Sequence, residues 1–303
     1  MSDSKKPTVE ANRLSKMLNQ VLGEERFPVK VEELALEYST QCFPNSPIAK
    51  IVGEDLPGFE GLLKSNKDQS RWLIVYNSSV ASPGRRRFTL AHEFGHYLLH
   101  RQLQPQFACS QQDMEEWDAD ERQIEVEADV FASFLLMPLD DFRKQVAGQA
   151  ISFDLLSHCA SRYGVSLTAA ALKWIEIADK RAVVVASRDD HLLWARSNQA
   201  AFKSGAFFAT RKNTIAVPRV SLAHSQNCIA TCQAASTRAQ VWFPREPGSM
   251  PLTEMTMVSD QYDYTLTLLL MPDAEWRAPQ HEDEAPEEDT FDRFIRNGQY
   301  PVR

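Results

Sequence analysis

Apolar positions in the first part of the chain recur every three or four residues, which is the spacing of amphipathic helices. This pattern predicts helices over residues 8–22, 29–38, 88–100, 124–138, 151–160 and 166–179. Gly23 ends the first of them and Pro138 ends the fourth, and both residue types commonly terminate helices. We therefore expect the N-terminal half of the chain to be mainly helical.

Short runs rich in β-branched and aromatic residues predict the strands. Residues 60–64 and 72–77 flank the polar segment Asn66–Asp68 and are typical of a hairpin. The second strand could hold a peptide at a sheet edge or lie buried in the centre, and the pattern fits both. Residues 101–123 are polar and acidic, which indicates a loop. Further strand-like runs lie at Ala182–Ser187, Leu192–Arg196, Phe207–Thr210, Ala239–Phe243, Glu254–Val258 and Tyr264–Met271.

The composition changes near Lys180, and this change predicts the domain organisation. We expect a largely helical domain over residues 1–180 and a smaller α+β domain over residues 181–273, which could sense a ligand. Residues 274–303 are acidic and contain prolines, so they are predicted to form a disordered tail. The fold class is therefore α+β.

Composition and charge limit the classes of protein to which this chain could belong. The chain has 43% hydrophobic and 24% charged residues, as an ordinary globular protein does. No apolar run reaches the ~18 residues of a membrane span, and the N-terminus shows no signal peptide, so we expect no membrane association. The 5 cysteines are widely spaced and do not indicate a disulfide framework, which favours a cytoplasmic protein. A net charge of −8 argues against direct binding of nucleic acid.

The segment His92-Glu93-Phe94-Gly95-His96 carries the most specific chemical signal. Histidines four residues apart lie on one face of a helix, so His92 and His96 can reach one metal ion. Glu93 would lie beside that ion and could take a proton from the attacking water. This is the HExxH pattern of zinc metalloproteases. His100 lies two turns beyond His92, too far to share the ion with both histidines, and we expect a structural or supporting role for it.

A third ligand is expected from the helix over 124–138, where Glu125 and Glu127 are both candidates. We favour Glu125 because Asp129 lies one turn further on the same face. Glu125 could then bind the metal while Asp129 accepts a hydrogen bond from a ligand histidine and orients it. Glu127 remains the alternative.

These segments together resemble the ImmA/IrrE family of bacterial metallopeptidases. The matching stretches are Arg87–His96, Glu125–Ala132 and Leu135–Pro138, which occur in the family's order, while Tyr163–Ser166 stands where the family has a short helix-turn-helix signature. The resemblance covers about residues 10–178. It implies a zincin-like metallopeptidase domain with His92, His96 and Glu125 as ligands of Zn²⁺ and Glu93 as general base.

The resemblance also implies a substrate. Members of the family cleave DNA-binding repressors of the helix-turn-helix (Cro-like) type and so release genes for stress response or mobile-element transfer. An acidic enzyme would attract such a basic protein. The alternative is a zinc-stabilised binding switch that sequesters the repressor without cutting it, although Glu93 favours catalysis. The His/His/Glu set favours zinc over manganese.

Overall fold

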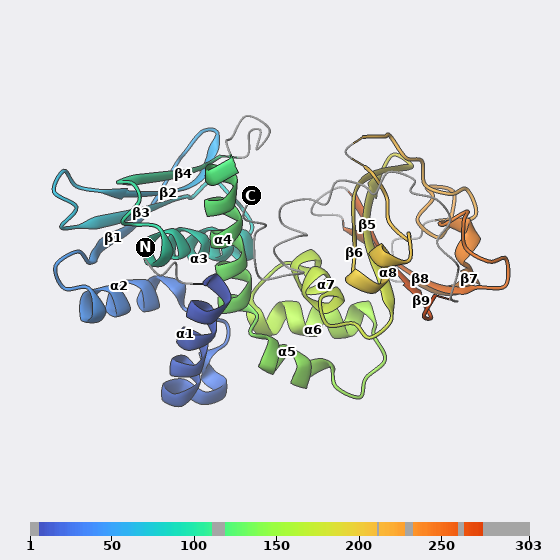
Figure 1. The fold of residues 1–303 in the computed structure, drawn as a ribbon, viewed down its shortest axis with the longest axis horizontal. Coiled ribbons are helices and arrows are strands. Elements are labelled where there is room, and N and C mark those ends of the chain that lie inside the picture. The colour runs from blue at the N-terminus through green and yellow to red at the C-terminus, as the bar shows by residue number, and fades with distance from the viewer. Residues whose placement is uncertain (1–5, 111–118, 211, 228–232, 260–263, 275–303) are drawn as a thin grey trace. The chain divides into compact units, whose positions relative to one another are not determined.

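A computed structural model of the chain describes residues 6–110, 119–210, 212–227, 233–259 and 264–274 (Figure 1). They form α-helices and two β-sheets, so the predicted α+β class is confirmed. The described residues divide into two compact units. Residues up to Gln145, with Cys159–Ser166, make the first, and Val146–His158 with the residues from Leu167 onward make the second. The limits predicted for independent domains stay predictions, and residues 275–303 of the predicted acidic tail lie outside the described residues.

The first unit contains the predicted N-terminal helices. They are α1 (Pro7–Leu22), α2 (Val31–Cys42), α3 (Pro83–Leu99) and α4 (Ala119–Leu136), followed by α5 (Leu139–Val146). Next along the chain come α6 (Phe153–Tyr163), whose first residues belong to the second unit, and α7 (Leu167–Ile175), which lies in the second unit. A short turn at Gly164 joins them, and its φ of 61° is in the left-handed region that glycine tolerates. This pair of helices matches the predicted helix-turn-helix-like segment.

The first sheet has four strands in the order β1-β3-β2-β4. They are β1 (Ile48–Glu54), β2 (Phe59–Ser65), β3 (Trp72–Asn77) and β4 (Gln106–Ser110). β2 and β3 form the predicted antiparallel hairpin, and β1 pairs with β3 in parallel. β3 is therefore a central strand, and β4 is an edge strand that pairs with β2. The prediction of a loop over residues 101–123 was wrong where β4 and the start of α4 lie.

α3 begins earlier than predicted because a capping motif precedes it. The Ser82 side chain accepts a hydrogen bond from the Arg85 backbone N–H at 3.3 Å, and Pro83 occupies the first turn. The helix then buries Leu90, Phe94 and Leu98. Burial of each such side chain stabilises the fold by roughly 1.5–3 kcal/mol. A hydrophobic core thus fixes the helix that carries the histidines.

The second unit is built on a five-stranded antiparallel sheet in the order β6-β5-β9-β8-β7. Its elements are β5 (Arg181–Arg188), β6 (His191–Ser197), α8 (Gln199–Lys203), β7 (Gln233–Arg238), β8 (Pro251–Ser259) and β9 (Tyr264–Met271). One face packs on α6 and α7 through residues such as Leu156 and Ile175, and the other face has a core around Trp242. Two predicted strands were wrong, because Phe207–Thr210 is irregular and Ala239–Phe243 begins with a 3-10 turn.

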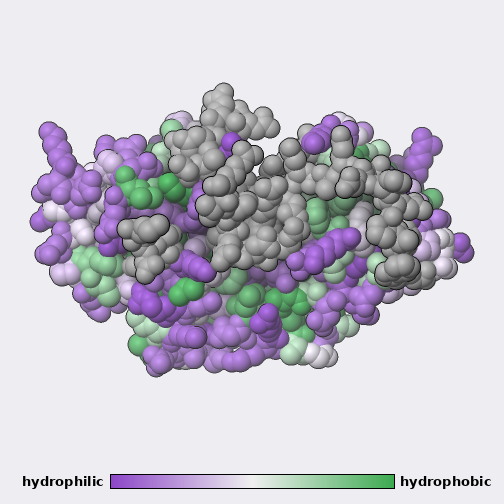
Figure 2. Space-filling view, in the orientation of Figure 1, coloured by the Kyte–Doolittle hydropathy of each residue, from purple (hydrophilic) through white to green (hydrophobic). Residues whose placement is uncertain are grey.

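Hydrophilic residues cover most of the coloured surface in Figure 2. The large apolar side chains that are exposed are spread over several elements, including Val21 of α1, Phe59 of β2 and Leu193 of β6. Within the part of the chain that the structure describes, no helix has the length and apolar character needed to cross a membrane.

Candidate metal centre

α3 and α4 bring three potential metal ligands together. His92, His96 and Glu125 each offer one ligand atom, and these atoms lie within 4.8 Å of one another. The His92 Nε2 and His96 Nε2 atoms are 2.9 Å apart. The two carboxylate oxygens of Glu125 lie 3.1 Å from His92 Nε2 and 3.3 Å from His96 Nε2. The three donors therefore converge on one small volume, as a metal site requires.

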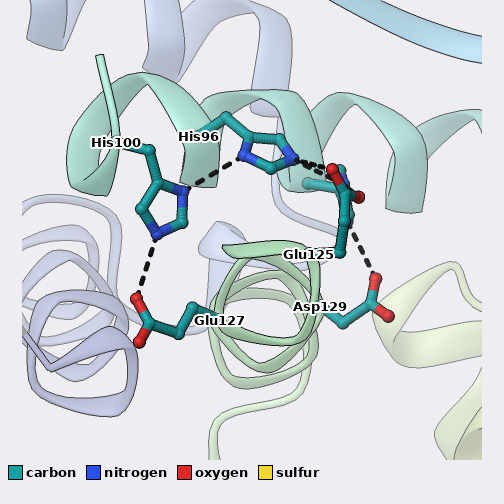
Figure 3. Close-up of polar contacts among 6 residues, drawn as sticks. His96, His100, Glu125, Glu127 and Asp129 are labelled. Carbon is teal, nitrogen blue, oxygen red and sulfur yellow. Dashed lines mark hydrogen bonds and ion pairs between the residues drawn. The ribbon is translucent and has the colours of Figure 1, made fainter. Parts of the chain in front are cut away.

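The helices can approach closely because small residues lie where they meet. An added Cβ at Gly95 would lie 3.3 Å from the Cα of Ala128 and 2.9 Å from the Phe131 ring. Gly95 thus allows α4 to pack directly against the backbone of α3, between the two histidines of the HExxH pattern. Figure 3 shows α3 passing across α4 at the site.

Each histidine also contacts a second polar group (Figure 3). His92 Nδ1 lies 2.8 Å from Asp129 Oδ1, and the orienting role of Asp129 stays a prediction. His96 Nδ1 lies 3.1 Å from His100 Nδ1. Glu127, the alternative third ligand, has an oxygen 3.0 Å from His100 Nε2 instead. The structure thus brings Glu125 to the histidine pair and Glu127 to His100.

Glu93 is fully buried beside the histidines and faces β2. An added Cβ at Gly61 of β2 would collide with the Glu93 carboxylate and the Thr89 methyl group. The missing side chain at Gly61 therefore leaves the space that the carboxylate occupies. Nothing in the sequence pattern of β2 had indicated this pairing of glycine and glutamate.

Comparison with known families agrees with this geometry. Residues 46–174 match the model of the IrrE N-terminal-like domain, a peptidase family. These residues are an IrrE N-terminal-like metallopeptidase domain. The family resemblance predicted from the motifs is thereby confirmed, and the family implies a metal. No curated protein matches the chain.

Electrostatics give the donors of the IrrE N-terminal-like domain the protonation states that a metal needs. Burial lowers the pKa of His96 to about 3, so its imidazole is neutral at neutral pH. Burial alone would raise the pKa of Glu125, but hydrogen bonds with His92 and His96 outweigh it and hold the pKa well below its ordinary value. Two imidazoles and one carboxylate are a donor set that suits a divalent cation, so the residues present fit a metal. Their individual roles stay predictions.

Two buried tyrosines of this domain, whose hydroxyl groups are of a kind that can stabilise an oxyanion, have other partners. The Tyr97 hydroxyl donates to the Ser46 carbonyl at 2.8 Å, and the Tyr163 hydroxyl donates to Asp141 at 2.7 Å. Sequence reasoning also missed Phe107 of β4, whose ring stacks on His96 with centroids 4.6 Å apart. The edge strand of the IrrE N-terminal-like domain therefore lies against the candidate metal centre.

Proposed function

We propose that the protein is a zinc-dependent endopeptidase. The observation that carries this proposal is the convergence of His92, His96 and Glu125, with a buried glutamate next to the first histidine. Three protein ligands with an open fourth position are typical of catalytic zinc sites. Two imidazoles and one carboxylate favour zinc over manganese.

A bound Zn²⁺ would supply Lewis-acid chemistry, which polarises the scissile carbonyl and makes a water molecule more acidic. Glu93 accepts a proton from the water molecule while the water oxygen forms a bond to the carbonyl carbon. As the C–N bond breaks, Glu93 returns the proton to the leaving nitrogen, and the products are a carboxylic acid and an amine. Asp129 accepts the Nδ1–H of His92 and so keeps Nε2 free of a proton for the metal.

β4 is the proposed binding edge for the substrate. Among the described strands only β2 pairs with β4, which makes β4 the edge strand at which we propose strand addition. Phe107 joins this edge to the candidate centre through its stacking on His96. An extended peptide paired with β4 would gain main-chain hydrogen bonds and pass the site.

The proposed substrate is a helix-turn-helix repressor of the Cro-like type, whose cleavage would release stress-response or mobile-element genes in the cytoplasm. This part rests on the family resemblance of residues 46–174. The net charge of −8 supports it, because a DNA-binding protein carries a basic surface that an acidic protein attracts.

Incubation with the repressor encoded beside the gene tests the proposal. Intact mass spectrometry would compare the zinc-loaded protein with Glu93→Gln, which keeps the size of the side chain but removes the base. Loss of a general base costs typically 10²–10⁴-fold in rate, so discrete fragments should appear with the wild type and not with the variant. Equal fragments with both proteins would refute the role of Glu93. An intact repressor that co-purifies with both would favour the non-cleaving binding switch.

A further inference from the structure

A chain of buried polar contacts leads away from His96 on the side opposite the candidate metal. His96 Nδ1 lies 3.1 Å from His100 Nδ1, and His100 Nε2 lies 3.0 Å from Glu127 Oε2. The Gln123 amide donates to the other oxygen of Glu127 at 2.9 Å. His100 is 3% exposed and Glu127 is 8% exposed. Figure 3 shows both residues on the far side of α4 from Asp129.

His96 and Glu127, the two ends of this row of contacts, determine the direction of the hydrogen bonds between them. His96 Nε2 faces His92 and Glu125, so a metal there needs the lone pair of this nitrogen. The proton of a neutral His96 must then be on Nδ1, which donates to His100 Nδ1. At the other end the Glu127 carboxylate accepts the proton of His100 Nε2. In this arrangement each histidine donates one hydrogen bond along the row, His96 to His100 and His100 to Glu127.

We propose that His100 and Glu127 are positioning residues that hold His96 in the tautomer and ring orientation needed for metal binding. The inference rests on the proposed metal site and adds two residues to it. His92 has a carboxylate, Asp129, directly on its Nδ1. His96 Nδ1 contacts His100, which in turn contacts the carboxylate of Glu127. α4 therefore supplies an acceptor for each ligand histidine, one directly and one through an intervening imidazole.

A purely structural role for the pair makes a different prediction. His100 and Glu127 would then only satisfy each other inside the protein, and their loss would lower stability without changing the intrinsic affinity for metal. A positioning role requires weaker metal binding in protein that is still folded, together with a change in the tautomer of His96. Measurements of affinity and tautomer therefore separate the two roles.

The experiment uses the full-length protein in four variants. His100→Phe keeps a ring but removes both hydrogen bonds, and Glu127→Ala removes the terminal acceptor. Glu127→Gln keeps an oxygen that can accept from His100. Tyr97→Phe is the matched control, because it also removes one buried hydrogen bond from α3, the one to Ser46, without touching the chain from His96. Zinc affinity is measured by competition with a chelator, folding by circular dichroism, and the His96 tautomer by ¹⁵N NMR.

Removal of a group that hydrogen-bonds to a metal-binding side chain typically weakens metal binding 10–100-fold. We expect this loss in His100→Phe and Glu127→Ala, a smaller loss in Glu127→Gln, wild-type affinity in Tyr97→Phe, and a reduced Nδ1–H population of His96 in the first two. If His100→Phe does not fold, the two Glu127 variants decide. Wild-type affinity and an unchanged His96 tautomer in folded His100→Phe and Glu127→Ala would overturn the inference and leave the metal site intact. Equal loss in Tyr97→Phe would overturn it also, whereas a wild type that binds no zinc would overturn the proposed function itself.

Discussion

Gly95→Ala tests whether the close approach of α3 and α4 builds the metal centre. In an exposed helix, alanine at a glycine position stabilises by about 1 kcal/mol. At Gly95 the new methyl group would lie 2.9 Å from Phe131 Cδ1 and 3.3 Å from Ala128 Cα. Ordinary contacts of this kind exceed about 3.5 Å, so the ring and the α4 backbone must both move.

Overpacking of a core by one carbon costs typically 1–3 kcal/mol. Helix propensity offsets about 1 kcal/mol of this cost. We therefore expect Gly95→Ala to lower the free energy of unfolding by between about 0 and 2 kcal/mol. The effect on metal binding should be larger, because α4 carries Glu125 and Asp129 away from His92 as it moves. A displacement of ~1 Å can cost about 10²-fold at a site that depends on geometry.

Urea denaturation of the metal-free protein would measure the stability, and chelator competition would measure the zinc affinity. Gly84→Ala is the control, because Gly84 also lies in α3 and its added Cβ would lie 3.2 Å from the Gly164 carbonyl oxygen, away from α4. It should lose stability without losing zinc affinity. A Gly95→Ala protein that is about 1 kcal/mol more stable than the wild type, with unchanged zinc affinity, would refute the packing argument.

Three further predictions follow from local contacts. Gly61→Ala should displace the carboxylate of Glu93 and reduce peptidase turnover by about 10²-fold, while zinc content measured by atomic absorption stays at the wild-type level. Asp129→Ala should weaken zinc binding 10–100-fold, because the first ligand histidine loses its acceptor; unchanged affinity would argue against that role. Burial alone would raise the pKa of Asp141, but hydrogen bonds, chiefly from Arg162, lower it. The stabilisation by Asp141 is therefore present above the unfolded pKa of about 3.9 and is lost as the pH falls through the lower folded value. Denaturation curves at pH 7 and below pH 4 should show Asp141→Asn less stable than the wild type at pH 7, with the gap narrowing in acid.

The sequence was sufficient for the parts of the fold that depend on local periodicity. α1, α3 and α4 follow from apolar residues at helical spacing, and the β2–β3 hairpin follows from two apolar runs around a polar turn. The HExxH pattern also predicts which helix face holds His92 and His96, because the i, i+4 relation is a property of one helix. Each of these inferences needs no knowledge of distant segments.

The sequence was less informative where a structure depends on pairing between segments that are distant in the chain. Whether β3 is central or at an edge depends on β1 and β4, and β4 has only five residues in a polar segment. β7 was missed because its sequence, Gln-Ala-Ala-Ser-Thr-Arg, lacks the apolar alternation of a strand, and its pairing with β8 overrides that weak propensity. Ala239–Phe243 has strand-forming residues, but two of its aromatic side chains pack into the core from a turn.

The choice between Glu125 and Glu127 shows why helix crossing matters for the site. Residues two apart on a helix point about 200° away from each other, so the two glutamates lie on different sides of α4. Because α3 passes across α4 near Gly95, its histidines extend to both sides of that helix. Glu125 therefore meets His92 and His96, and Glu127 meets His100, at distances of 3.0–3.3 Å. Acidic residues at alternate positions of α4 can thus contact each of the histidines that α3 carries at one-turn spacing. The glycine at the crossing point sets how close the two rows come.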